Sequence, residues 1–198
     1  MNLFDRVKNL LLSTATEWEE IKGETWSTSD LFTKYAIILA AIPAAAGFLG
    51  YSFFGTSYGF GSYKLGFGTS LTLAVLTYAL TLAGIFVLGF IIDGLALSFG
   101  STKDMAASLK VAVFSSTPAW VAGILNIFPA LGILVVIASI YGLVLLYMGL
   151  ERVKSVPKEK MVGYFVVTLI AAILVYVVVG AIVGAIALSS AAIPRPNF

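Results

Sequence analysis

Five long apolar stretches constrain the fold more than any other feature of this sequence. They run over about residues 34–54, 69–92, 105–127, 130–150 and 161–188. Each is close to or longer than the roughly 20 residues that an α-helix needs to cross the hydrocarbon core of a bilayer. The sequence therefore predicts an all-α membrane protein, a five-transmembrane-helix bundle that occupies residues 31–190.

The composition agrees with a lipid-facing surface and excludes several function classes. Of 198 residues, 60% are hydrophobic and 11% are charged, whereas a soluble domain carries about a quarter charged residues. The chain has no cysteine and no histidine, which removes disulfides, thiolate nucleophiles and the commonest general base and metal ligand. A net charge of +2 leaves no dense basic face for nucleic acid. We therefore expect no catalytic residue, no metal site, no cofactor and no nucleic-acid partner.

The placement of lysine and arginine predicts the orientation of the bundle. With the N-terminus in the cytoplasm, ten basic residues face the cytoplasm and two face outward. The inner group is Arg6, Lys8, Lys22, Lys34, Lys103, Lys110, Arg152, Lys154, Lys158 and Lys160, and the outer pair is Lys64 and Arg195. The first thirty residues mix acids and bases without an apolar core, which argues against a cleaved signal peptide. Residues 191–198 then form a short external tail.

Residues 1–30 form a cytoplasmic segment whose first part is predicted to be an amphipathic helix. Leu3, Val7 and Leu10 recur at helical spacing, and a Thr14–Glu17 capping box indicates a break there. The helix either lies in the membrane interface, with Phe4 and Trp18 as lipid or partner contacts, or packs on the cytoplasmic end of the bundle. This segment is also a candidate site for a protein partner.

The first and third spans contain prolines, and the third is the more polar. Pro43 should kink the first span, which Ser27 or Asp30 precedes as a candidate cap. In the third span, proline frees a backbone carbonyl that neighbouring hydroxyls can satisfy. This span is either shielded by the other helices or enters the bilayer obliquely. Its short connection to the fourth span predicts a tight antiparallel hairpin.

Polar residues at membrane depth are the candidate functional residues. Asp93 ends the second span and Lys110 begins the third, so the two either form a structural pair or an ion or proton site. The remaining candidates lie further along the third span: Ser115, Ser116, Thr117, Pro118 and Asn126.

Small residues predict where helices approach one another closely. Gly180 and Gly184 form a GxxxG pattern on the last span, which favours self-association into a homo-oligomer. The glycine-rich loop at 55–68 matches no nucleotide-binding fingerprint, and its aromatic residues are typical of an interfacial belt. A binding role for that loop stays open.

The sequence resembles bacterial members of the Yip domain family over about residues 11–184. Among the runs that carry the resemblance are Trp18-Glu19-Glu20-Ile21-Lys22, Ile92-Asp93-Gly94-Leu95-Ala96, and Ser115-Ser116-Thr117-Pro118-Ala119-Trp120-Val121-Ala122-Gly123-Ile124-Leu125-Asn126. Shorter matches are Ile42-Pro43-Ala44, Phe128-Pro129-Ala130-Leu131-Gly132 and Tyr141-Gly142. It implies a cytoplasmic N-terminal segment, five spans and a bacterial inner-membrane location. Eukaryotic relatives associate with Rab-type GTPases, but this sequence lacks their Asp-Leu-Tyr-Gly-Pro-like motif.

Two functional interpretations follow from these observations. In the first, the protein is a non-enzymatic membrane organiser that self-associates and recruits partners or lipid through its N-terminal segment. In the second, it transports a small solute, an ion or a lipid along a polar path near Asp93, Lys110, Ser115–Pro118 and Asn126. Polar side chains that converge on one cavity would favour transport, and side chains paired with one another would favour the organiser.

Overall fold

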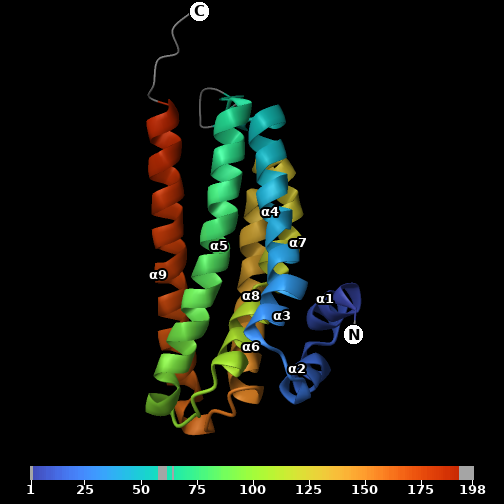
Figure 1. Cartoon of the computed structure of the whole chain (residues 1–198), viewed down its shortest axis with the longest axis vertical. Coiled ribbons are helices and arrows are strands. Elements are labelled where there is room, and N and C mark those ends of the chain that lie inside the picture. Colours follow the sequence, from blue (N-terminus) through green and yellow to red (C-terminus); the bar gives the residue numbers. More distant parts are fainter. Residues whose placement is uncertain (1, 58–61, 64, 192–198) are drawn as a thin grey trace, which may run out of the picture.

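The computed structural model describes residues 2–57, 62, 63 and 65–191 as a bundle of helices along one axis (Figure 1). Five stretches are long and apolar enough to cross a membrane: Thr28–Phe54, Phe67–Phe99, Met105–Ile127, Gly132–Arg152 and Lys158–Ala187. The predicted five-span bundle is therefore confirmed. Four of these stretches extend a few residues beyond the predicted apolar runs at one end or both.

The first span is built from several helical turns of different pitch. Its elements are α3 (Thr28–Leu31), the π-helical η1 (Phe32–Ala36), α4 (Ile37–Leu49) and the π-helical η2 (Gly50–Phe54). Ser27 is its N-cap, as predicted, since its Oγ accepts the Asp30 N–H at 3.0 Å. Asp30 is therefore a first-turn residue rather than the cap. The helix α4 continues on both sides of Pro43.

A two-stranded hairpin and a long helix follow the first span. The strands β1 (Thr56–Ser57) and β2 (Ser62–Tyr63) pair antiparallel, and α5 (Phe67–Leu95) continues into the 3₁₀ turn η3 (Ala96–Phe99). Residues 58–61 and 64 of the glycine-rich loop, like the predicted tail 192–198, lie outside the described residues. The predictions for Lys64, Arg195 and the central part of the aromatic belt therefore concern residues that are not described.

The third span lies at the centre of the bundle. Its elements are α6 (Met105–Ser115), α7 (Thr117–Ala122) and the 3₁₀ turn η4 (Gly123–Ile127). Within its most apolar window, 72% of the residues are buried inside the protein, against 11–28% for the other four spans. The other helices therefore shield its polar residues from lipid, in agreement with the first of the two predicted alternatives.

The third span breaks at Ser116, as the proline suggests. Pro118 has no N–H and stands in the first turn of α7. The Ser116 N–H bonds to the Val113 carbonyl at 3.1 Å, and its Oγ donates to the Ala112 carbonyl at 3.0 Å. The Ser116 N–H bonds to the carbonyl three residues before it instead of the one four residues before it, so the Ser116 hydroxyl satisfies the Ala112 carbonyl at the break.

The last two spans differ in how much the bundle covers them. The short turn η5 (Pro129–Leu131) leads into α8 (Gly132–Arg152), which returns along α6 and α7 as the predicted antiparallel hairpin. The final helix α9 (Lys158–Ala191) packs mainly on α5 and lies at the edge of the bundle (Figure 1). Only 11% of its most apolar window is buried, so most of its surface faces outward.

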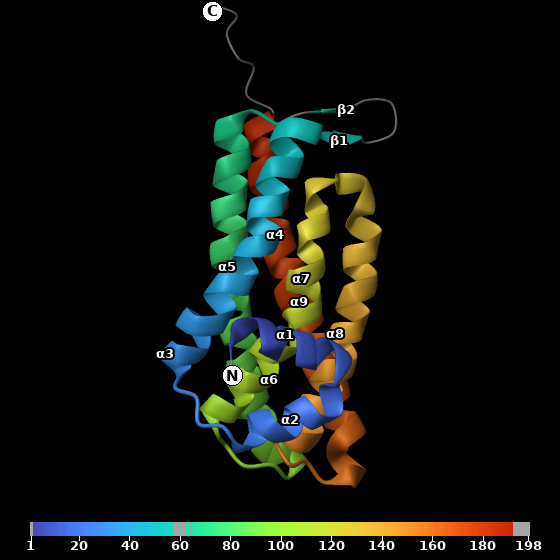
Figure 2. The same cartoon turned by 90° about the vertical axis from the view of Figure 1, so that its right-hand side faces the viewer.

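Two short helices, α1 (Leu3–Leu12) and α2 (Thr14–Gly23), lie against one side of the bundle, in the half that ends with the turn between α8 and α9 (Figures 1 and 2). The segment breaks where predicted, but the Thr14–Glu17 capping box is wrong. Ser13 is the N-cap of α2, and the Thr14 hydroxyl donates backward to the Leu10 carbonyl at 2.8 Å. Leu10 is completely buried, so the segment packs on the bundle.

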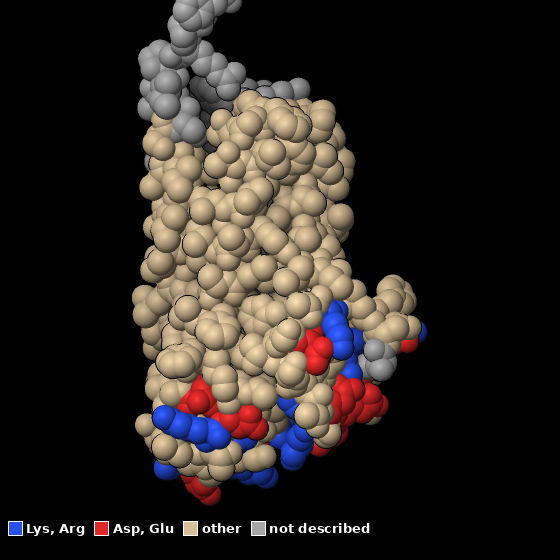
Figure 3. All heavy atoms as spheres, in the orientation of Figure 1, with Lys and Arg blue, Asp and Glu red and all other residues tan. Residues whose placement is uncertain are grey.

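Charged side chains gather at the end of the bundle on which α1 and α2 lie (Figure 3). Every charged residue in the described part of the chain falls within 2–36, 93–110 or 151–160, which we call the charged end. The opposite end carries none among the described residues. This one-sided distribution is that expected of a helix bundle set across a bilayer.

Candidate functional site at the charged end

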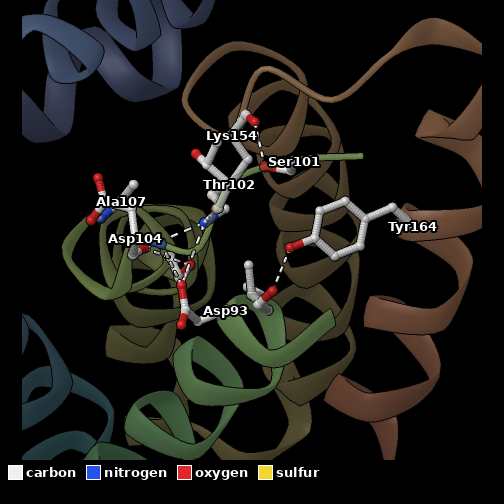
Figure 4. Close-up of polar contacts among 9 residues, drawn as sticks. Asp93, Ser101, Thr102, Asp104, Ala107, Lys154 and Tyr164 are labelled. Carbon is white, nitrogen blue, oxygen red and sulfur yellow. Dashed lines mark hydrogen bonds and ion pairs between the residues drawn. The ribbon is translucent and has the colours of Figure 1, made fainter. Parts of the chain in front are cut away.

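Asp93 stands in the last turn of α5 and is the hub of a polar network (Figure 4). Its Oδ1 accepts the Asp104 N–H at 2.7 Å and the Ser108 hydroxyl at 3.2 Å. The same oxygen lies 3.6 Å from Nζ of Lys154. The carboxylate therefore ties the end of α5 to the start of α6 and to the connection between α8 and α9.

Lys154 is a buried lysine in the connection between α8 and α9. Its Nζ donates to the Thr102 carbonyl at 2.7 Å, and its own carbonyl accepts the Ser101 hydroxyl at 2.6 Å. Burial lowers the pKa of Lys154 below its ordinary value, while the neighbouring Asp93 carboxylate opposes that shift. These partners are fixed by the fold, so the network has a structural character.

Lys110 does not pair with Asp93, and the predicted pair is wrong. Its Nζ donates to the carbonyls of Ile21 at 2.9 Å and Glu24 at 2.7 Å, at the C-terminal end of α2. The reason is helical geometry. Ser108 faces Asp93, and two further residues turn the helix by about 200°, so Lys110 points away from α5. Its ammonium instead caps α2, where the helix dipole favours a positive charge.

Arg6 is buried and forms ion pairs with two carboxylates of the N-terminal segment. Its Nη1 donates to Glu17 Oε1 at 2.6 Å, and its Nη2 pairs with Glu24 Oε1. The guanidinium also lies over the Phe114 ring, 5.7 Å from the centroid. Arg6 and Glu17 are both buried, so this pair forms part of the contact between the segment and α6.

The two carboxylates around Arg6 differ in their electrostatics. Burial raises the pKa of Glu17 above its ordinary value, although Arg6 acts in the opposite direction. For Glu24, burial would also raise the pKa, but hydrogen bonds from Trp26 and Arg6 outweigh it and hold the pKa below its ordinary value. Glu24 is therefore the carboxylate whose ionised form favours the docked segment.

Trp18 is completely buried, so the prediction that it contacts lipid or a partner is wrong. Its ring packs edge-on against Phe114, with centroids 6.3 Å apart, and sits on Gly149 of α8. A Cβ at Gly149 would lie 2.8 Å from the Trp18 ring, so a glycine is needed there. Phe4, the other predicted contact, is 75% exposed on α1.

The remaining predicted residues lie apart from this site. The Thr117 hydroxyl is 2.8 Å from that of Tyr35, within the bundle. Asn126 lies at the opposite end, where its backbone carbonyl approaches Gly50 so closely that a Cβ there would be 2.2 Å away. Asp93, Lys110 and Asn126 therefore do not converge on one place.

Gly180 and Gly184 face open space on α9. A Cβ added at either position would meet nothing within 4 Å, so the described chain leaves this surface uncovered. The pattern therefore does not serve packing within one protomer.

The sequence did not predict that three residues of the charged end, Arg6, Glu17 and Lys154, are buried and paired. Arg6 stands four residues before the buried Leu10, so it shares a helix face with it, and that spacing was an available signal. Nothing in the sequence distinguishes Lys154 from its basic neighbours. Across the described residues, no group of carboxylates is placed to hold a metal ion.

The fold and its one-sided charge define an integral membrane protein with five spans. The chain belongs to the Yip1 domain family, whose model matches residues 8–189. It is similar to "Inner membrane protein YohC" of Escherichia coli K12, with 29% identity over 163 residues, 80% of this chain and 84% of the relative. The YohC protein of Escherichia coli O6:H1 matches with the same figures. No solved structure matches the chain.

Proposed function

We propose that this protein is a non-enzymatic scaffold of the bacterial inner membrane that self-associates through α9. The observation that carries the proposal is the uncovered face of α9 around Gly180 and Gly184. In hydrocarbon, small residues spaced by four let two helix backbones approach closely, so such a face is suited to a second copy of the chain. The similarity to inner membrane proteins of Escherichia coli supports the location.

The arrangement of the polar residues supports a scaffold rather than a transport path. Asp93 has Lys154 as a charged partner, and Lys110 is held by backbone carbonyls, so each charge already has a partner within the protein. Asn126 lies near the opposite end of the third span. A path along these residues would have to connect sites that the bundle keeps separate.

The charged end supports a cytoplasmic orientation of the N-terminal segment, because basic residues concentrate on the cytoplasmic side of membrane proteins. There, α1 presents Phe4, Lys8 and Leu12 at four-residue spacing on its exposed face. Phe4 and Leu12 are each 75% exposed, although the bundle covers the opposite face of the helix. This stripe is suited to contact the bilayer surface or a protein partner.

Single-cysteine crosslinking in membranes tests the self-association, since the chain has no cysteine of its own. Gly180→Cys on α9 should give disulfide-linked dimers on mild oxidation. The matched control is Ile133→Cys, because Ile133 is an exposed residue of α8 in the same half of the bundle as Gly180. This variant should stay monomeric. Equal crosslinking at both positions, or none at Gly180, would refute an α9 interface.

A further inference from the structure

One face of α1 is largely apolar and points away from the bundle. Phe4 and Leu12 are each 75% exposed, and Lys8 is exposed between them. Residues four positions apart lie on one side of a helix, so these three side chains form a stripe. The opposite side of α1 carries Arg6 and Leu10, which are buried against the rest of the protein. Docking of α1 therefore leaves the stripe uncovered by the described chain.

The first span shows where the hydrocarbon core ends relative to α1. Residues from Tyr35 to Phe54 carry no charge. At about 1.5 Å per residue they extend about 30 Å along the axis, which matches the thickness of the hydrocarbon core. Lys34, directly before them, thus marks the hydrocarbon boundary at the charged end. Arg6 of α1 lines one cavity together with Asp30 and Lys34, so the N-terminal half of α1 lies at this boundary.

The C-terminal half of α1 lies beside the uncharged part of α8. The Leu11 carbonyl accepts the Tyr141 hydroxyl of α8 at 3.1 Å. Toward the charged end, the first charged residue of α8 is Glu151, about ten residues or 15 Å of helix beyond Tyr141. This distance exceeds the length of a tyrosine side chain. The helix α1 also contacts α7, which follows the last charged residue of the third span. Leu12 therefore lies at the depth of the hydrocarbon.

The stripe continues a surface that faces lipid. On α8, which is one of the five spans, Ile140 and Val144 lie close to Tyr141 and are 59% and 48% exposed. The C-terminal end of α1 is bonded to Tyr141, so the stripe joins this apolar surface. In contrast, α2 lies further from the uncharged end than α1 and exposes Glu19 and Glu20 (Figure 2). The segment therefore places its apolar stripe at the hydrocarbon boundary and its exposed acids further out.

We propose that α1 is an interfacial helix that inserts Phe4 and Leu12 among the acyl chains of the leaflet at the charged end. The depth of α1 favours lipid over a cytoplasmic protein, because lipid surrounds the bundle there. Lys8 fits this position, since its methylene groups pack beside the acyl chains while its ammonium reaches the lipid phosphates. The insertion adds a lipid contact outside the five spans and does not depend on self-association through α9.

Spin labels on single cysteines test the insertion, since the chain has no cysteine of its own. Full-length Phe4→Cys and Leu12→Cys are labelled and reconstituted, a single chain per disc, in nanodiscs of phosphatidylethanolamine and phosphatidylglycerol. Electron paramagnetic resonance with power saturation then compares two collision reagents: oxygen, which concentrates in hydrocarbon, and nickel ethylenediaminediacetate, which stays in water. Both positions are exposed, so the labels leave the buried contacts of Arg6 and Leu10 in place.

Two control positions calibrate the measurement. Ile137→Cys reports the lipid-facing surface of α8, and Glu20→Cys reports the exposed surface of α2. The ratio of oxygen to nickel collisions at Phe4 and Leu12 should be severalfold higher than at Glu20, and at Leu12 it should approach the ratio at Ile137. Ratios as low as at Glu20 would place the stripe in water, and few collisions with either reagent would show that protein covers it. Either result would overturn the proposal.

Discussion

Replacing Lys110 with methionine should detach the N-terminal segment while leaving the transmembrane bundle intact. The buried ammonium donates to the Ile21 and Glu24 carbonyls. Two hydrogen bonds from a charged donor contribute about 3–6 kcal/mol, and removing the buried charge recovers part of that as relieved desolvation. We expect a net loss of about 2–4 kcal/mol in docking free energy, roughly two orders of magnitude in the docking equilibrium.

Hydrogen-exchange mass spectrometry in nanodiscs measures this loss directly. In Lys110→Met, amides of α1 and α2 should exchange much faster than in the wild type, while α8 and α9 keep their protection. Lys103→Met is the matched control, because Lys103 is an exposed lysine at the same end of the bundle. Unchanged protection of α1 and α2 in Lys110→Met would refute the capping role, and a loss of protection throughout the bundle would show that the segment is not separable.

Three further results are expected. In a double-mutant cycle measured by thermal unfolding, Asp93→Asn and Lys154→Met should be coupled by about 1 kcal/mol. In a second cycle, the effects of Asp93→Asn and Lys110→Met should be additive. The reverse pattern would show that Asp93 pairs with Lys110 instead. Trp18→Ala should cost about 3–5 kcal/mol of docking free energy, as for other buried tryptophans, and a near-neutral effect in the same exchange experiment would contradict its burial. Because the pKa of Glu24 is lowered in the folded state, its contribution is present above the ordinary pKa of 4.5 and is lost as the pH falls through the folded value. Glu24→Gln should therefore weaken docking at neutral pH and remove that acid-dependent step in a pH series, and an unchanged step would rule Glu24 out.

The spans were predictable because hydrophobic length is a local property of the sequence. A run of about 20 apolar residues specifies a membrane helix whatever its neighbours are. The Ser27 cap and the break beside Pro118 are local for the same reason, since each depends on groups within one helical turn. Even the polar character of the third span has a simple origin, because that span is enclosed by the others.

The partners of the charged residues were not predictable, because they depend on how distant segments meet. Asp93 had several lysines within reach along the sequence, and only the path of the α8–α9 connection selects Lys154. Trp18 fits an interfacial anchor by its residue type, but Gly149 on α8 provides the space that buries it. Contacts between residues that lie far apart in the sequence leave no trace in local spacing.

Native mass spectrometry of the protein released from nanodiscs tests the proposed scaffold most directly. The wild type should give dimers or larger assemblies. Gly180→Leu/Gly184→Leu should be monomeric, because the bulkier side chains would keep two α9 helices apart. Ile133→Leu on α8 should assemble like the wild type. A wild type that is monomeric under conditions that preserve membrane complexes, or a double variant that assembles equally well, would contradict the account.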